Sequence, residues 1–259
     1  MSKDMERVFA VLLALAMVAV FAAPAVAQSD VKEKAPMYSY VGNWAIPRAQ
    51  WGEMDKNTAA DDAILQKALA SGTIIGYGDD RVIVHQADGE THDDWWSSMS
   101  EAGLMNVLEQ FYKSGNSATP VLDSATKHWD NIYVSRYYNW KSGSWKGLYG
   151  HGSLYHLKAD APDDAVAVLS KNLFVPFMEK LLADGTIVEY EVDVEAIHTD
   201  NPNTFLFYYL CSNAECLDKV NIALQGWMKA NPMGGPAIGS MVDFSTHRDV
   251  LLRSNATYK

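Results

Sequence analysis

Two His-x-Asp triplets are the residues of this sequence whose types and spacing could do chemistry. They read His128-Trp-Asp130 and His247-Arg-Asp249, and each lies where a strand is expected to start. Positions two apart in a β-strand share a face, so each imidazole would have a carboxylate beside it. Such a carboxylate fixes the tautomer of the histidine and raises its basicity, as a general base or a metal ligand requires.

A further pair of histidines, His85 and His198, repeats at corresponding positions of the chain. If the extended segments converge, each half would present two histidines and an aspartate together. The candidate catalytic residues are therefore His85, His128, Asp130, His198, His247 and Asp249. Two interpretations stay open, because a His or Asp at the start of a strand can also satisfy loop backbone groups and stabilise the fold. The spacing identifies neither a metal nor a cofactor.

These residues belong to two copies of one unit. The segment Lys67-Ala-Leu-Ala-Ser-Gly-Thr-Ile-Ile-Gly-Tyr77 returns as Lys180-Leu-Leu-Ala-Asp-Gly-Thr-Ile-Val-Glu-Tyr190, a helix end that runs through glycine into a strand. The match continues without a gap, so that Asp80 falls on Asp193 and Trp95-Trp96 on Tyr208-Tyr209. Each copy has room for a small α/β domain, which a solenoid repeat does not. Two such copies pair most simply face to face, because each sheet must bury an apolar face.

The expected elements follow the same order in both copies. In the first copy, residues 37–139, we expect a strand at 38–46, a helix capped by Asn57 or Thr58 and ending before Gly72, strands at 73–86 and through Trp95-Trp96, a helix at 104–111 and a strand at 128–138. In the second copy, residues 153–259, the strands are expected at 154–158, 186–198, 204–210 and 247–253, with helices in 160–183 and up to Trp227. Residues 140–152 would link the copies. This order is the β-α-β-β-α-β of a ferredoxin-like unit.

Two ferredoxin-like units in one chain, each with the helix-Asp/Ser-Gly-Thr-Ile-strand signature, resemble a tandem form of the dimeric α/β barrel superfamily. That superfamily includes antibiotic-biosynthesis-type monooxygenases, EthD-like and NIPSNAP-like proteins, and haem-handling members. The resemblance covers nearly all of the expected mature chain at the level of topology, and its short signature is not specific to one activity. It implies an α+β fold in which two ferredoxin-like β-α-β-β-α-β repeats pack as a pseudo-dimeric α/β barrel, with a small ligand between a sheet and its helices.

Differences between the copies indicate where a pocket is to be expected. Asp94 of the first copy corresponds to Phe207 of the second, and Gly76 to Glu189. One half could therefore keep a pocket while the other became scaffold. The third strand of the first copy is the more polar one, so we expect the pocket there.

Cysteines and clustered aromatic residues complete the candidate features. Cys211 and Cys216 are predicted to form a structural disulfide, because their spacing is not that of a Cys-x-x-Cys redox motif. The aromatic residues of 137–149 could form a platform for a ligand or hold the two copies together. Trp95, Trp96, Tyr208 and Tyr209 are expected in packing and not in a cofactor site.

The first 27 residues have the pattern of a cleaved secretory signal. Lys3 and Arg7 precede the apolar run 8–23, and Ala25-Val26-Ala27 ends it. That run is too short for a membrane-spanning helix, so we expect a periplasmic or secreted protein without a stable membrane anchor, with a flexible lead-in at 28–36. A formal net charge of -11 argues against a nucleic-acid partner. Because the chain holds both copies, we expect a monomer.

Two hypotheses of function follow. The first is an exported protein that binds a small ligand, aromatic or hydrophobic in character, in a pseudo-symmetric barrel. The second is a cofactor-independent or metal-assisted enzyme of the monooxygenase or isomerase type, with His128 and Asp130 or His247 and Asp249 as acid–base pairs. The fold admits both, because one fold hosts many functions.

Overall fold

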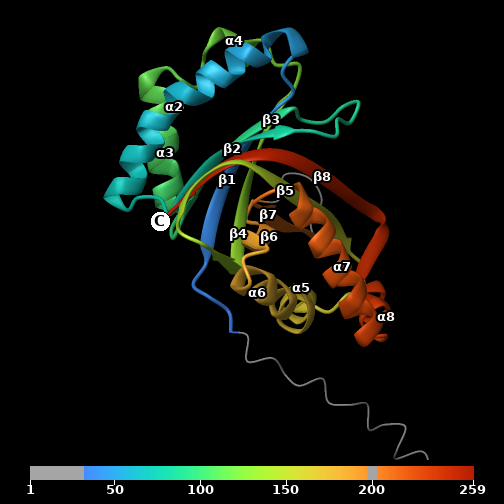
Figure 1. Ribbon diagram of the computed structural model, residues 1–259. Coiled ribbons are helices and arrows are strands. Elements are labelled where there is room, and N and C mark those ends of the chain that lie inside the picture. Colours follow the sequence, from blue (N-terminus) through green and yellow to red (C-terminus); the bar gives the residue numbers. More distant parts are fainter. Residues whose placement is uncertain (1–31, 198–202) are drawn as a thin grey trace, which may run out of the picture. The chain divides into compact units, whose positions relative to one another are not determined.

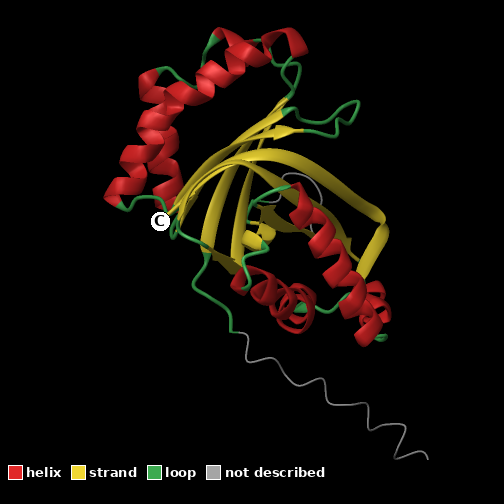
Figure 2. Ribbon diagram, viewed as in Figure 1, coloured by secondary structure: helices red, strands yellow, loops and turns green. Residues whose placement is uncertain are grey.

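Eight antiparallel strands form a closed barrel in the computed structural model, which describes residues 32–197 and 203–259 (Figures 1 and 2). Closure gives every strand two hydrogen-bonded neighbours, so no edge is left to pair with another chain. The strands are β1 (Met37–Trp44), β2 (Gly76–Val82), β3 (His92–Ser98), β4 (His128–Trp140), β5 (Gly143–Leu157), β6 (Ile187–Glu195), β7 (Thr204–Cys211) and β8 (Val242–Tyr258).

The order of the strands around the barrel keeps each half of the chain together. The first half contributes β4-β1-β3-β2 and the second contributes β8-β5-β7-β6. The two halves join where β2 pairs with β8, placing Asp80 opposite Ser254, and where β4 pairs with β6, placing Val134 opposite Val194. The chain therefore has an α+β fold whose barrel closes within one polypeptide.

Helices cover the outside of the barrel in two groups. In the first group, α3 (Glu101–Ser114) packs on β1 and β3, and α2 (Trp51–Ser71) packs on β2, on α3 and on α4 (Pro120–Asp123). In the second group, α6 (Val175–Ala183) packs on β4 and β6, α7 (Ala214–Ala230) on β7, and α8 (Gly234–Met241) on β8. Two short stretches, η1 (Arg48–Gln50) and η2 (Ser170–Phe174), precede α2 and α6. A further helix, α5 (Ala165–Leu169), precedes η2.

Glycines end the two helices that carry the repeated sequence signature. Gly72 follows α2 with φ 76°, and Gly185 follows α6 by two residues with φ 82°. These left-handed values are strained for residues with a Cβ, which explains why both copies of the signature have glycine at this position.

Two expectations about element boundaries were wrong. Residues 140–152 are not a linker, because β5 already begins at Gly143, and a register shift between Trp145 and Leu148 disguises its alternation. α2 begins at Trp51, so Asn57 and Thr58 lie inside the helix instead of capping it.

The N-terminal caps of α3 and α7 are Ser100 and Asn213, whose side chains accept hydrogen bonds from Gly103 N and Cys216 N.

The expected signal segment 1–27 lies outside the described residues, as do residues 28–31 of the expected lead-in. No helix of the described residues is long and apolar enough to cross a membrane.

Alternation along the strands gives the barrel an inner and an outer face. On the outer face of the first half, Tyr40, Tyr77 and Trp96 pack with Leu65 of α2 and Leu104 of α3. A second apolar cluster lies inside the barrel, where Trp95, Tyr208 and Tyr258 are its largest members. The expectation that Trp95, Trp96, Tyr208 and Tyr209 are packing residues is confirmed, because all four are buried.

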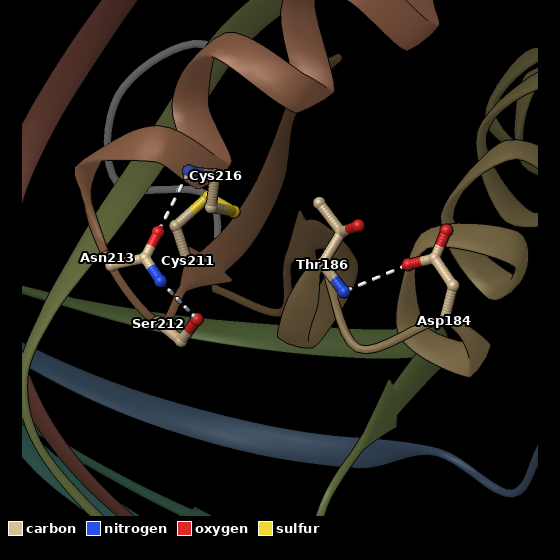
Figure 3. Close-up of a disulfide and its surroundings, with 6 residues drawn as sticks. All are labelled: Asp184, Thr186, Cys211, Ser212, Asn213 and Cys216. Atoms are coloured by element: carbon tan, nitrogen blue, oxygen red, sulfur yellow. Dashed lines mark hydrogen bonds between the residues drawn. A yellow bond between two sulfur atoms is a disulfide. The ribbon is translucent and has the colours of Figure 1, made fainter.

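The predicted disulfide between Cys211 and Cys216 is present where β7 turns into α7 (Figure 3). The Cα atoms of the two residues are 5.5 Å apart. Asn213, between them, accepts a hydrogen bond from Cys216 N at 3.1 Å. The bridge and the cap therefore fix the same turn.

Carboxyl groups crowd the inner face of the barrel. Glu189, Glu191, Asp193 and Glu195 occupy alternate positions of β6, and Asp80 and Asp93 face inward from β2 and β3. Burial raises the pKa of Asp80 to about 8 and that of Glu191 to about 7, and it also raises the pKa of Asp93, Glu189 and Asp193. Desolvation is the main cause, and neighbouring carboxylates add to it.

Stability of the ligand-free protein should fall as the pH rises through the pKa values of these inner carboxyl groups. Unfolded carboxyl groups titrate near 4, so between that pH and about 8 the folded chain binds more protons than the unfolded chain, and its stability is lost as pH rises through the folded pKa. We expect Tm to fall by about 5 °C or more from pH 6.5 to pH 9. Scanning calorimetry measures this.

The double variant Asp80→Asn/Asp193→Asn should flatten the fall, since amides do not titrate. A wild-type Tm that is constant or rises over this interval would contradict the expectation.

Candidate ligand-binding site

A cavity of about 130 Å³ lies between the outer face of the first-half strands and the helices α2, α3 and α4. Its walls combine aromatic rings with acidic side chains. It therefore occupies the position between sheet and helices, and in the half of the chain, where the sequence predicts a pocket.

The aromatic wall is rigid because its rings stack and one is anchored. Tyr40 of β1 stacks on Trp96 of β3 with 4.3 Å between ring centroids, and Phe111 of α3 contacts Trp96 with a tilted ring at 5.3 Å. The indole Nε1 of Trp96 donates a hydrogen bond to Leu104 O at 3.2 Å. A flat apolar surface held in this way suits a planar ligand.

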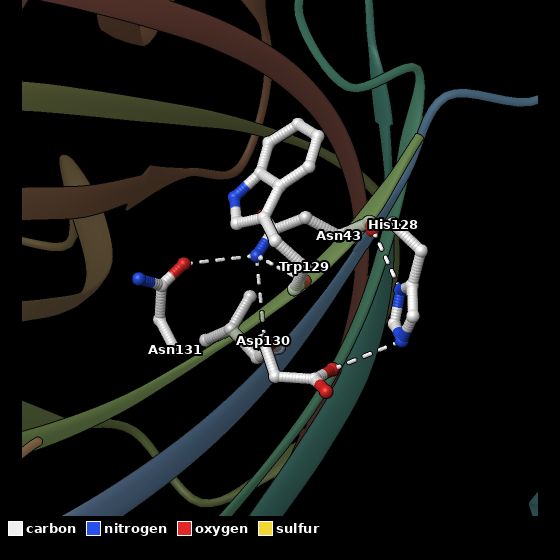
Figure 4. A network of polar contacts seen from close by, with 6 residues as sticks. Asn43, His128, Trp129, Asp130 and Asn131 are labelled. Carbon is white, nitrogen blue, oxygen red and sulfur yellow. Dashed lines mark hydrogen bonds and ion pairs between the residues drawn. The ribbon is translucent and has the colours of Figure 1, made fainter. Parts of the chain in front are cut away.

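His128 and Asp130 lie at the open side of this cavity (Figure 4). His128 Nε2 is 3.4 Å from Asp130 Oδ1, and the two side chains are 37% and 40% exposed. On the opposite edge of the ring, Nδ1 is 3.0 Å from Asn43 O. Trp44 stacks on the imidazole at 3.6 Å, which fixes the plane of the ring.

The contact with the carbonyl determines the tautomer of His128. A carbonyl oxygen only accepts, so Nδ1 carries a hydrogen and donates it to Asn43 O. Nε2 is then left facing Asp130 Oδ1 at 3.4 Å. The pair can therefore accept a proton from a bound molecule or return one to it.

Asn43 connects this pair to the inner face of the barrel. Its side-chain Nδ2 donates to Trp129 O at 3.2 Å and to Asn131 Oδ1 at 3.0 Å (Figure 4). These bonds tie β1 to β4 beside His128. The carbonyl that orients the imidazole is thus held by buried hydrogen bonds.

Three further aspartates, which the sequence reading did not select, line the cavity. Burial raises the pKa of Asp61 to about 6 and raises the pKa of Asp79 and Asp94 as well. Asn116 Nδ2 donates to Asp61 Oδ1 at 2.8 Å, and Asn255 Nδ2 donates to Asp79 Oδ1 at 2.9 Å. A carboxyl group that is protonated near neutral pH can donate a hydrogen bond to a ligand.

One signal in the sequence could have revealed Asp61. Asn57, Asp61 and Leu65 are spaced by four residues and share the buried face of α2. Polar residues on the apolar stripe of a helix indicate a site. A helix capped by Asn57 or Thr58 would have Asp61 in its first turn, where acidic residues are common, so the late start expected for this helix concealed the signal.

The second His-x-Asp triplet also forms a close pair. His247 Nε2 is 2.9 Å from Asp249 Oδ1, and Tyr155 stacks on His247 at 4.5 Å, as Trp44 stacks on His128. Ser153 Oγ donates to Asp249 Oδ1 at 2.6 Å. Each triplet therefore brings its His and Asp together on one face, as the spacing predicts.

The surroundings of the two pairs differ. Asp94 stands opposite Gly42 in the β1–β3 register, whereas Phe207 stands opposite Ser153 in the β5–β7 register. Phe174 stacks on Phe207 at 4.6 Å. Aromatic side chains thus occupy, in the second half, the place that acidic groups and open space occupy in the first.

The expected convergence of two histidines with an aspartate does not occur in the first half. His85 lies exposed after β2 and stacks on Trp51 at 5.4 Å, and Trp44 is the aromatic partner of His128. His198 lies outside the described residues. In the described part of the chain, no three or more His, Cys, Asp or Glu side chains are grouped so that they could hold a metal ion.

Comparisons with known proteins support the fold and leave the activity open. No protein-family model matches the chain, and no curated protein matches it in sequence. A solved structure of a proposed monooxygenase from Lactobacillus acidophilus NCFM is similar with a TM-score of 0.64 and 12% identity, over 87% of this chain and 97% of that chain. A proposed monooxygenase from Fusobacterium nucleatum gives 0.59 and 9%, over 87% and 95%.

An anthrone oxidase-like protein gives a TM-score of 0.56 and 9% identity, over 87% of this chain and 94% of that chain. These neighbours belong to the dimeric α/β barrel superfamily. At such identities the likeness concerns the fold alone. The chain has the dimeric α/β barrel fold, as the resemblance in sequence implied.

Proposed function

We propose that this protein binds a small aromatic molecule in the cavity between the first-half sheet and α2–α4. The observation that carries the proposal is that a stacked aromatic wall, Tyr40 on Trp96, and the close pair His128 and Asp130 line one cavity. A ring would lie against the wall, and a hydroxyl or amino substituent would reach the carboxyl groups.

We propose further that the two halves are ferredoxin-like repeats that arose by duplication and then diverged. Each has the strand order of the ferredoxin-like unit, and corresponding register positions carry an aromatic ring stacked on a His-x-Asp histidine. In the second copy, Phe174 stacks on Phe207 at the position that corresponds to the cavity of the first copy. We therefore assign ligand binding to the first copy.

Filling the cavity should abolish binding without unfolding the chain. A Cβ at Gly42 would lie 3.4 Å from Trp44 Nε1 and 3.5 Å from Asp130 Oδ1, so a side chain there fits only by occupying the rim. With 4-fluorophenol as the probe, we expect Gly42→Val to weaken binding about 10-fold or more and Gly42→Ala to weaken it less. Fluorine NMR line broadening measures the affinity.

The matched control for this experiment is His247→Gln in the second half, which should bind the probe as the wild type does. Calorimetry of each variant checks that it is folded. Equal binding by wild type and Gly42→Val would refute this cavity as the site.

A second function, oxygenation without a cofactor, is favoured by the 3.4 Å contact between His128 Nε2 and Asp130 Oδ1 in the wall of the same cavity. We propose that the pair removes a proton from an activated carbon of a bound hydroxyaromatic or ketone, and that the resulting carbanion reacts with O2. With anthrone the balance is anthrone plus O2 giving anthraquinone plus water. The shape and charge of the cavity set which substrate enters, because the fold by itself does not.

An oxygen electrode with anthrone as substrate tests this second function. We expect the wild type to consume one O2 per anthrone and His128→Gln to lose about 100-fold or more in rate, since glutamine keeps a donor for Asn43 O and cannot exchange a proton. His247→Gln should retain the rate. If anthrone is oxidised no faster with the protein than without it, the second function is refuted and ligand binding remains the proposed function.

We also propose that the chain is exported and acts as a monomer. The expected signal at 1–27, the Cys211–Cys216 disulfide and the absence of a membrane-spanning helix among the described residues support export. Both partners of the closing strand pairs belong to one chain, which supports a monomer. Light scattering and mass spectrometry of protein from the exported fraction should give a monomer that begins at Gln28. A dimer or an intact N-terminus would contradict it.

A further inference from the structure

The interior of the barrel is a second cavity, of about 770 Å³, separate from the site on the outer face. Inward-facing residues of all eight strands line it, and exposed Gln86, Ser245 and Arg248 lie at its opening. Small β-barrels usually fill their interior with side chains. A lumen of this size can hold a molecule.

Several carboxyl oxygens that point into the lumen have no hydrogen-bond partner among the described residues. They are Oδ1 of Asp80, Asp93 and Asp193, residues that are 5%, 8% and 1% exposed. The hydroxyl of Tyr208 also lacks a partner within the described chain. Buried polar groups in proteins almost always have partners, so these oxygens need a donor from within the lumen, which water or a bound cation can supply.

The spacing of the carboxyl groups excludes a compact occupant. Glu191, Asp193 and Glu195 follow one another at alternate positions of β6, which separates them by about 7 Å along the strand. Asp80 and Asp93 form a register pair on β2 and β3. No described group of three carboxylates or histidines is close enough to hold one metal ion. Positive charges spaced along a chain match this pattern better than one ion does.

Apolar surface lies between the carboxyl groups. Trp95, Tyr133, Leu206 and Leu252 contribute to the wall of the same lumen. Methylene groups can pack on these side chains, and the aromatic rings also attract ammonium groups. The basic residues among those lining the lumen are Arg248, at the opening, and His156. The lumen therefore favours a flexible aliphatic cation.

We propose that the lumen binds a linear aliphatic polyamine, with its ammonium groups paired to Asp80, Asp93 and Asp193 and its methylene groups against Trp95 and Leu206. The ammonium groups supply the donors that the buried oxygens lack. Glu191 and Asp193 are alternate residues of β6, and their spacing is close to that between ammonium groups separated by four methylenes, so Glu191 can pair with a further ammonium group. Binding here requires nothing of the outer cavity.

Titration calorimetry of the mature chain with spermidine tests the proposal. We expect one spermidine per chain, and a loss of affinity of about 30-fold or more in Asp80→Asn/Asp193→Asn, because two charge-assisted hydrogen bonds are lost while side-chain volume is kept. The control Asp163→Asn/Asp164→Asn removes the same charge from exposed positions and should bind within about twofold of the wild type. Butylamine has one ammonium group, so its affinity should be lower than that of spermidine by about 10-fold or more.

Calcium chloride serves as the competing probe. If the proposal is correct, millimolar calcium leaves spermidine affinity unchanged once ionic strength is matched. Stoichiometric displacement by calcium, no binding of spermidine at millimolar concentration, or equal affinities in the two double variants would overturn it. Should Asp80→Asn/Asp193→Asn fail to fold, Asp93→Asn is measured in its place and is expected to lose about 5-fold or more.

Discussion

Closure of the eight-stranded barrel is the constraint on which the rest of this structure depends. The pairs β2–β8 and β4–β6 join the two halves, so no strand keeps an open edge. Because side chains alternate along every strand, closure sends each residue either into the lumen or toward the helices. His128 and Asp130 thereby face α2–α4, while Trp129 and Asn131 between and beside them face inward.

The outer faces of the two halves show how one framework supports different surroundings. In both, a His-x-Asp pair on the last strand meets an aromatic ring from the first strand, Trp44 or Tyr155. The neighbouring strands differ: Asp79 pairs with Asp94 in one half, and Val192 pairs with Phe207 in the other. These positions therefore carry acidic groups beside the cavity in the first half and apolar groups in the second.

Much of this arrangement could be predicted from the sequence because it depends on local spacing. The repeated Gly-Thr-Ile segments located equivalent helix ends, and the i, i+2 spacing placed each His beside its Asp. The position of His85 could not be predicted, since a loop leads it to Trp51. The start of β5 was missed because glycines and a register shift interrupt its alternation. The alternating acids of β6 were visible in the sequence, but only closure shows that they face inward.

The inner carboxyl groups are unfavourable for folding, because they place ionisable side chains where apolar ones would pack at lower cost. An apolar residue at Asp80 or Asp193 would avoid the cost of burying a carboxyl group whose oxygen lacks a donor. The chain carries several such groups on facing strands, and their mutual repulsion raises that cost as they ionise. Conflicts between local rules and global packing concentrate at functional sites. A cationic ligand would remove the conflict, because it supplies donors and opposite charge to the oxygens that closure of the barrel withdraws from water.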